Sequence, residues 1–200
     1  MIDIIQRVMR ASKSEKAASH ERIVQEAATQ LRERGADRPA VAEVMRAAGM
    51  THGGFYKHFD SRDALVAEAT ERAMTENAPA IDAIVSEVED PLAAFVDWYV
   101  SEAHRDDAGH GCGVVALAND APRNISIQAA YRTQVERYLD LLADLVGGED
   151  PDRRARAAVT LSTLVGAVLI ARALGDTPVS DELLANVRDA VRERRLLAAR

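Results

Sequence analysis

Apolar residues recur every three or four positions through most of the 200-residue chain, which is the spacing of one face of an α-helix. In the stretch ERIVQEAATQLRERG, Ile23, Ala27 and Leu31 share one face, and Gly35 follows as a C-terminal cap. A second and shorter run, VAEVMRAAG, ends at Gly49. No stretch shows the alternation of β-branched and aromatic residues that is typical of strands. The pattern therefore predicts an all-α protein.

Clusters of Pro, Gly and Asp divide the rest of the chain into further helical segments. We expect these helices near 79–88, 91–106, 112–119, 124–146, 151–174 and 179–197. The organisation that follows has three parts: an N-terminal arm over 1–19, a unit of short helices over 20–66 and a larger helical domain over 67–200. The arm carries several Lys and Arg residues, so it is either a basic arm that contacts a polyanion or a disordered tail.

The stretch GMTHGGFYKHF, residues 49–59, concentrates unusual residues after the second helix. Thr51 is a candidate N-cap for a short helix through Phe59, and Asp60 or Ser61 opens a longer one. A helix, a tight Gly turn, a short helix and a longer helix form the layout of a helix-turn-helix, whose second short helix enters the DNA major groove. We expect Phe55 and Phe59 to face inward. The outward residues are then the bare glycines, Gly53 and Gly54, and three phosphate donors, Tyr56, Lys57 and His58.

In this part of the chain the sequence resembles the TetR-type bacterial transcriptional regulators. The resemblance rests on a spaced motif that is met by Gly49, Thr51, Phe55, Tyr56, His58, Phe59, Ser61, Arg62 and Leu65. It implies phosphate contacts from Thr51, Tyr56, His58 and Arg62, and base-facing positions at His52, Gly53 and Lys57. The chain departs from the family pattern at Pro39, Ala40 and Ala42, where side-chain donors are missing, so we expect Arg46 or the N-terminal arm to supply that backbone contact.

The charge distribution modifies this picture. The chain has a net charge of −7, but residues 1–60 carry +2 and residues 61–200 carry −9, and all three lysines lie in the first part. Such asymmetry is typical of a small polyanion-binding unit on an acidic body. The longest apolar run, LVGAVLIARAL, is interrupted by Arg172, and the first residues lack the continuous apolar region and the small-residue cleavage site that are typical of a signal peptide. We therefore expect a cytoplasmic protein without a membrane partner or a cofactor.

The last two helices are candidates for a dimer interface. The segment ARAAVTLSTLVGAVLIARAL is apolar or small almost all round, so it must be buried on more than one side. The resemblance implies that these helices pair with their copies in a homodimer that reads a palindromic operator. The candidate interface residues are Leu161, Leu164, Val165, Val168, Leu169, Leu184, Val187 and Val191.

The resemblance also implies a small ligand inside the acidic domain, whose binding releases the operator. Near-apolar residues with a few polar handles are candidates to line such a pocket, although each of them can equally be plain core. These candidates are Phe95, Trp98, Tyr99, Leu117, Asn119 and Tyr131. The expected function is thus a DNA-binding regulator that acts as a repressor released by an unknown small molecule.

The single cysteine supports a rival mechanism. Cys112 lies at a predicted helix N-terminus between two glycines, where a lowered thiol pKa would suit a redox or electrophile sensor, whereas a small buried hydrophobe is the common alternative. The segment His104–Cys112 also holds Asp and His residues, but their spacing matches no closed zinc pattern, so we expect no metal. No nucleophile motif or phosphate loop is present, which disfavours an enzyme. A helical ligand-binding protein without DNA affinity is the remaining alternative.

Overall fold

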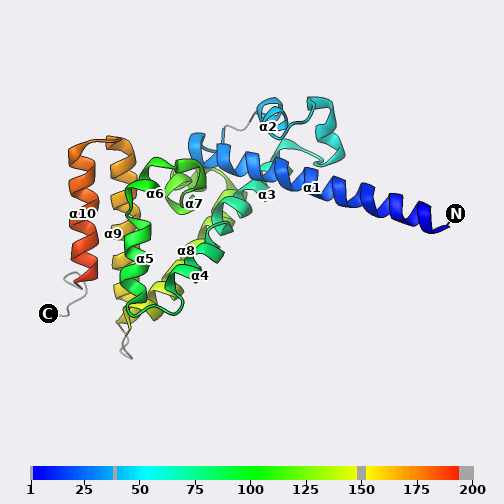
Figure 1. The fold of residues 1–200 in the computed structure, drawn as a ribbon. Coiled ribbons are helices and arrows are strands. Elements are labelled where there is room, and N and C mark those ends of the chain that lie inside the picture. Colours follow the sequence, from blue (N-terminus) through cyan, green and yellow to red (C-terminus); the bar gives the residue numbers. More distant parts are fainter. Residues whose placement is uncertain (1, 38–39, 148–151, 194–200) are drawn as a thin grey trace.

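The computed structural model describes residues 2–37, 40–147 and 152–193, with side chains from Lys13 onward (Figure 1). The N-terminal part holds three α-helices and a short 3₁₀ helix. They are α1 (Ile2–Arg34), α2 (Val41–Ala47), η1 (His52–Lys57) and α3 (Arg62–Thr75). Over the described ranges every regular element is a helix, so the predicted all-α class is confirmed.

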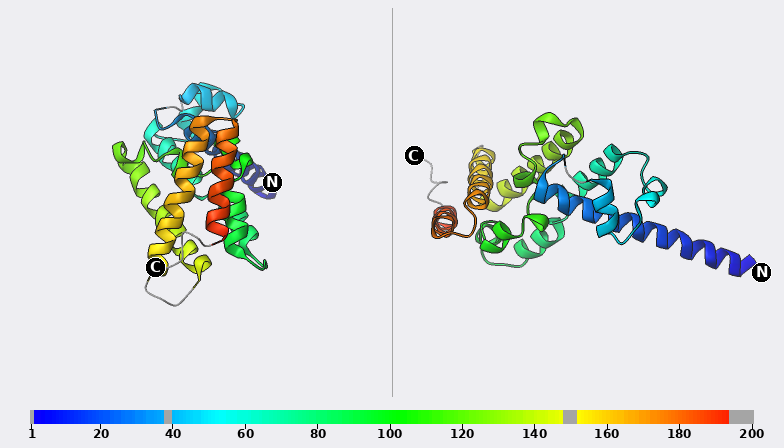
Figure 2. Two further views of the ribbon diagram at one scale, coloured as in Figure 1. Left: turned by 90° about the vertical axis from the view of Figure 1, so that its left-hand side faces the viewer. Right: turned by 90° about the horizontal axis from the view of Figure 1, so that it is seen from above.

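The larger C-terminal part consists of seven further α-helices and two short 3₁₀ turns within the described ranges. They are α4 (Ala78–Val85), α5 (Pro91–Tyr99), α6 (Glu102–Asp106), η2 (Ala108–His110), α7 (Gly113–Ala116), η3 (Ala121–Arg123), α8 (Ile125–Val146), α9 (Arg153–Leu174) and α10 (Pro178–Arg192). Figure 2 shows α9 and α10 lying side by side as one outer face of the molecule, opposite the end from which α1 projects.

Helix α1 is longer than the sequence pattern indicated. It begins at Ile2, so residues 2–19 continue the predicted helix, and no helix boundary falls near residue 20. The stretch 11–22, ASKSEKAASHER, contains no Pro or Gly and is rich in Ala, Lys and Glu, which are strong helix formers. Arg7 and Arg10 are two of the basic residues of the predicted arm, and their side chains lie outside the described part of the structure.

Helix α1 belongs to both halves of the molecule. Its middle residues Ile23, Ala27 and Leu31 are fully buried, and the helix packs along α3 and against α2. Its C-terminal end contacts η2 and α7 of the larger part. Any displacement of α7 or η2 is therefore applied directly to the helix that carries the N-terminal unit.

The predicted helix over 91–106 is two helices. α5 ends at Tyr99, and α6 starts after Ser101, whose side-chain oxygen accepts a hydrogen bond from the His104 N–H at 3.1 Å. A serine cap satisfies one of the free N–H groups of a new helix and so favours a break in the axis. The sequence pattern missed this break because the apolar spacing continues across it.

Helix α9 is the apolar centre of the C-terminal part. By length and composition alone it could cross a membrane, with a mean hydropathy of 1.9 over its most apolar window. It lies between α8 and α10, with Leu164 and Val168 fully buried against them. Its inner face is thus explained by core packing, and the composition test is weak support for a membrane span.

Candidate nucleic-acid interface and helical body

The short helix η1 is anchored by two aromatic side chains. Phe55 and Phe59 are almost fully buried, and their rings stack with centroids 5.6 Å apart. His20 of α1 stacks on the other side of Phe59 at 4.5 Å, and its Nε2 lies 2.6 Å from the Glu68 carboxylate of α3. This packing confirms the predicted inward face of the stretch and fixes η1 against both long helices. The sequence reasoning did not identify His20, whose role depends on contacts 39 and 48 residues away.

The turn between α2 and η1 requires glycine at Gly49. Its φ of +75° lies in the left-handed region that side chains rarely adopt. The N–H of Gly49 donates to the Arg46 carbonyl at 3.0 Å, and the N–H of Met50 donates to the Met45 carbonyl at 2.7 Å. These bonds end α2 at Ala47 and set the direction in which the chain continues to η1.

The exposed side of η1 forms a continuous surface of small and hydrogen-bonding residues. Thr51, His52, Gly53 and Lys57 are exposed, and the Tyr56 side chain is 74% exposed. A Cβ added at Gly53 would meet nothing within 4 Å, so another molecule can approach the backbone closely there. A phenol, an ammonium, an imidazole and a hydroxyl in one row can donate hydrogen bonds to phosphate oxygens or base edges.

Gly54 does not share this bare surface. It is half-buried, and a Cβ there would lie 3.5 Å from the Met45 methyl group. Its small side therefore faces α2, which corrects the expectation that both glycines leave their backbone open. Thr51 precedes η1 in an extended conformation, but its hydroxyl makes no capping hydrogen bond, contrary to the predicted cap.

His58 is turned inward, whereas we expected it on the outward side. The ring is half-buried beside His20 and Phe59, and its Nδ1 is buried with no hydrogen-bond partner among the described residues. The physical reason is that His58 comes directly after the last residue of η1, three positions from the buried Phe55, and its ring packs near the rings of His20 and Phe59. Burial, followed by the nearby positive groups His20, Lys16 and Lys57, lowers its pKa from 6.5.

Two arginines flank the exposed row. Arg46 lies exposed at the end of α2. Arg62 is exposed at the start of α3, and its Nη2 donates to the Ala36 carbonyl at 2.9 Å, so part of its hydrogen-bonding capacity holds the loop after α1. Ala40 occupies the N-cap of α2 without a side-chain hydrogen bond, as its composition requires, while Pro39 lies outside the described residues.

The predicted ligand-lining residues are divided between the core, a cavity wall and the surface. Phe95, Tyr99 and Leu117 have no exposed surface and are part of the core. Trp98 lines a cavity of about 190 Å³ together with His104 and neighbours from α4 and η2. Asn119 is exposed, and Tyr131 is half-buried on α8. Phe95 and Tyr99 lie against Tyr138 of α8, with ring centroids 6.4 and 6.3 Å apart, so these two fill the interior between α5 and α8, whereas Trp98 lies in a cavity wall as expected.

Cys112 lies at the centre of a buried polar cluster. Its exposed fraction is 1%, its thiol accepts a hydrogen bond from the Tyr99 hydroxyl at 3.2 Å, and the Tyr138 hydroxyl lies 3.6 Å away. The Cys112 N–H donates to Nε2 of His104 at 2.9 Å. Burial raises the pKa of both phenols well above 10. A thiol so enclosed suits the role of a buried hydrophobe better than that of a sensor, which needs access to its oxidant.

The other acidic and imidazole groups of this segment have partners of their own. Asp106 pairs with Arg105 at 2.6 Å, and Asp107 accepts from His110 at 3.0 Å. Over the described ranges, no three His, Cys, Asp or Glu side chains are grouped so that they could hold a metal ion.

The eight predicted interface residues divide between the interior and the surface. Leu161, Leu164, Val168, Leu184 and Val191 are buried within the chain itself, because α9 and α10 pack on each other and on α5 and α8. Val165 and Val187 are half-buried, and Leu169 is exposed. The exposed apolar residues on this face are instead Val159, Leu169, Ile170, Leu174 and Val179.

Comparison with known proteins agrees with this geometry. Residues 23–69, which span the end of α1 through most of α3, match the family described as bacterial regulatory proteins, tetR family. The uncharacterized HTH-type transcriptional regulator Rv0196 of Mycobacterium tuberculosis is 33% identical over 173 residues, covering 80% of this chain and 87% of that protein.

Solved structures share the whole architecture. A TetR transcriptional regulator from Chloroflexus aurantiacus superimposes with a TM-score of 0.75 at 20% identity, over 89% of this chain and 96% of that one. A TetR-family regulator from Agrobacterium tumefaciens gives 0.72 at 20% identity, over 87% and 97%. A helix-turn-helix head held by buried aromatic residues, joined through α1 to an all-helical body, thus accompanies clear sequence similarity, and the chain belongs to the TetR family of DNA-binding transcriptional regulators.

Proposed function

We propose that the protein is a cytoplasmic homodimeric repressor that binds a palindromic operator through η1 and leaves it when a small molecule binds the helical body. The observation that supports this most directly is the row of exposed donors on η1, with Tyr56 and Lys57 outward and Phe55 buried behind them. A helix that carries hydrogen-bond donors on one side and buried anchors on the other can bind in the major groove while its own position stays fixed.

The exposed apolar face of α9 supports the dimer. Ile170 is 51% exposed, and Val159 and Leu169 lie on the same side of the helix. A Cβ added at Gly166 would meet nothing within 4 Å, so a second helix can approach closely at that point. Contiguous apolar surface of this kind marks an interaction site, and a two-fold contact across α9 and α10 would bury it. Two copies of η1 must then lie about 34–36 Å apart to read successive major grooves.

Release by a ligand requires two conformations of the dimer that differ in the distance between the two helix-turn-helix units. A ligand shifts the equilibrium only by its difference in affinity for them, and about 5.5 kcal/mol of difference converts almost complete occupancy into almost complete release. Helix α1 links the helical body to the helix-turn-helix unit, because it packs against α2 and α3 of that unit and against η2 and α7 of the body.

The test is a mobility-shift titration of the purified protein on the DNA upstream of its own gene, at two salt concentrations. Tyr56→Phe removes only the exposed hydroxyl, and we expect operator affinity to fall about tenfold or more because a bond to a charged phosphate is lost in each subunit. Tyr131→Phe, which alters a half-buried hydroxyl of α8, is the matched control and should bind like the parent protein.

Lysine substitution supplies an independent readout. Lys57→Gln should make operator binding less sensitive to salt, since each lost phosphate contact lowers the slope of log affinity against log salt by about one. Absence of sequence-selective binding to the upstream DNA and to a random-sequence pool would favour a ligand-binding protein without DNA affinity.

A further inference from the structure

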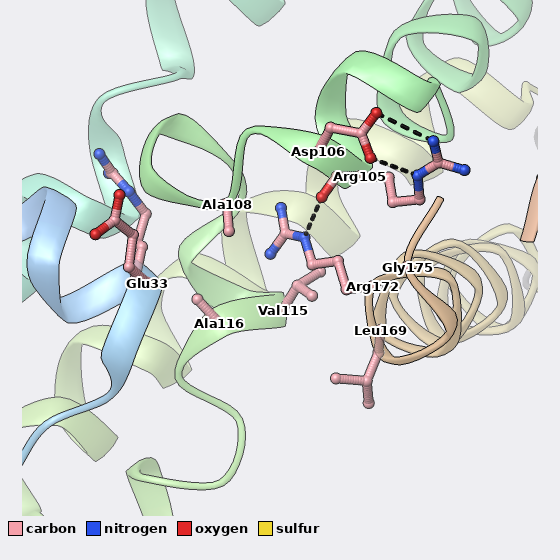
Figure 3. A pocket seen from close by; sticks show the side chains of 10 residues that line it. Glu33, Arg105, Asp106, Ala108, Val115, Ala116, Leu169, Arg172 and Gly175 are labelled. Carbon is pink, nitrogen blue, oxygen red and sulfur yellow. Dashed lines mark hydrogen bonds and ion pairs between the residues drawn. The ribbon is translucent and has the colours of Figure 1, made fainter. Parts of the chain in front are cut away.

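A cavity of about 460 Å³ lies where the C-terminal end of α1, the α6–η2 segment, α7 and the end of α9 meet (Figure 3). Its volume falls in the range that holds small-molecule ligands. The walls combine three arginines and two carboxylates with small and aliphatic side chains. The lining residues are Arg32, Glu33, Arg105, Asp106, Ala108, Val115, Ala116, Leu169, Arg172 and Gly175.

Two of the three arginines are fully paired. Nε of Arg32 donates to the Gly109 carbonyl at 2.6 Å, and its Nη2 pairs with Glu76. Arg105 pairs with Asp106 through two bonds, and its Nη1 donates to the Asp181 carboxylate at 2.6 Å. The positive charge of each is thus neutralised by its own partners.

Arg172 is different, because its partners are neutral. Nε donates to the Arg105 carbonyl at 3.3 Å and Nη2 to the His104 carbonyl at 2.8 Å. Within the described part of the chain no carboxylate lies within ion-pairing distance of its guanidinium, and the side chain is half-buried. Burial lowers its pKa below the ordinary value of arginine. Figure 3 shows the guanidinium projecting from α9 into the cavity, between Ala108 and Ala116.

The surroundings hold this guanidinium in place. A Cβ at Gly111 would lie 2.2 Å from the Arg172 Nη2, so the side chain fills a space that only glycine leaves free. Asp107 attracts this guanidinium from beyond ion-pair distance. A half-buried cation without an ion pair still costs free energy, and an anion that enters the cavity would offset this cost. One unpaired positive charge matches one negative charge, and the guanidinium fork matches a carboxylate.

We propose that this cavity binds a small organic monocarboxylic acid, with the carboxylate on Arg172. Val115, Ala116 and Leu169 line the adjoining wall, so they suit an apolar aliphatic or aromatic body. Glu33 stands across the cavity from Arg172 and repels a second acidic group (Figure 3). The ligand class is therefore an acid with one negative end and an apolar remainder.

The position of the cavity allows a bound acid to influence the helix-turn-helix unit. Glu33 and Arg32 lie on α1, the helix on which the helix-turn-helix packs, while Leu169 belongs to the exposed face of α9. A ligand between these walls changes the spacing of α1 relative to α9. This effector role rests on the proposed function, whereas the binding site itself does not.

The test measures direct binding to the purified full-length protein by calorimetry and by thermal shift. The probes are matched pairs of an acid and its neutral amide: benzoate and benzamide, phenylacetate and phenylacetamide, hexanoate and hexanamide, extended to a library of acids with up to about 15 non-hydrogen atoms. We expect acids to bind at least about tenfold more tightly than their amides, and dicarboxylates to bind more weakly than monocarboxylates. Equal binding of acids and amides throughout the library overturns the proposal.

Two variants locate the site. Arg172→Met should abolish the preference for acids, and Ala116→Leu should fill the cavity while the hydrogen bonds of Arg172 stay in place. Should Arg172→Met fail to fold by circular dichroism, Ala116→Leu decides the matter. Arg154→Met is the matched control, because Arg154 lies about 27 Å along α9 and only loses an exposed ion pair with Asp140. Acid binding that survives Ala116→Leu overturns the assignment of the cavity.

A final arm separates the site from its regulatory role. An acid that binds should weaken operator binding in the mobility-shift assay for the parent protein and not for Ala116→Leu. Unchanged operator affinity with bound acid overturns the effector role. Absence of operator binding without any acid overturns the proposed function instead, and it leaves the calorimetric result on the cavity unaffected.

Discussion

His104 makes stability dependent on pH in a way that can be calculated from its surroundings. The ring is buried, its Nδ1 lies 2.5 Å from the Tyr99 carbonyl, and its Nε2 accepts from the Cys112 N–H. Because the Cys112 N–H can only donate, Nε2 carries no proton and Nδ1 donates to Tyr99. Protonation would put a hydrogen on Nε2 against another donor and a charge in the core. Burial lowers the pKa of His104 to about 4 in the folded protein.

The magnitude follows from the difference between the folded and unfolded states. The ordinary pKa of histidine is 6.5, so between pH 6.5 and about 4 the unfolded chain binds the proton and the folded protein does not. Acidification therefore favours unfolding. The free energy of unfolding contributed by this residue is fully present above pH 6.5 and falls by about 1.4 kcal/mol per pH unit, or by about 3 kcal/mol in total at pH 4.

The assay compares the parent protein with His104→Gln, whose amide can donate to the Tyr99 carbonyl and accept from Cys112 without titrating. Urea unfolding is followed at pH 8, 6, 5 and 4 at one fixed protein concentration, because a dimer's stability depends on concentration. We expect the difference in unfolding free energy between the two proteins to change by about 3 kcal/mol over this range, with the variant less sensitive to acid. Parallel pH profiles would refute the reasoning.

Three further substitutions test the packing by urea unfolding at pH 7.5. Gly113→Ala should destabilise by about 2–3 kcal/mol, because its Cβ would lie 2.7 Å from the Ala73 carbonyl oxygen and must push α7 from α3. Gly53→Ala, on the exposed side of η1 with nothing within 4 Å, should instead leave stability unchanged or raise it by up to about 1 kcal/mol, and an equal loss at both glycines would contradict this. Arg32→Met should cost about 3 kcal/mol, since it removes a fully buried guanidinium from Glu76; a change under 1 kcal/mol would show that the pair is not needed.

Local pattern alone determined much of the head. The spacing of Ile23, Ala27 and Leu31 depends only on which residues are apolar. Gly35 and Gly49 mark turns at which φ is positive, a conformation that glycine adopts most readily. The inward face of Phe55 and Phe59 follows from the same periodicity. These features are encoded within single turns of helix, so one sequence is enough to find them.

Features that depend on contacts between distant residues were decided by tertiary packing. His58 turned inward at the end of η1, where its ring lies near His20 of α1, and no residue pattern in so short a stretch indicates a contact 38 residues away. The break at Ser101 likewise depends on a capping free energy of about 1 kcal/mol, which neighbouring contacts readily outweigh. The extension of α1 to Ile2, by contrast, follows from its local content of strong helix formers, because residues 13–18 are exposed.

The helical body shows most clearly that burial is decided by the tertiary structure. An apolar or aromatic residue looks the same in a sequence whether it fills the core, as Phe95 and Leu164 do, or faces outward, as Leu169 does, because which side of a helix is covered depends on distant helices. Arg172 was visible in the sequence only as a charge that interrupts an apolar run. Its neutral partners and most of its cavity wall come from residues 56 to 140 positions earlier in the chain, and only the folded arrangement of α1, α6, α7 and α9 brings them together.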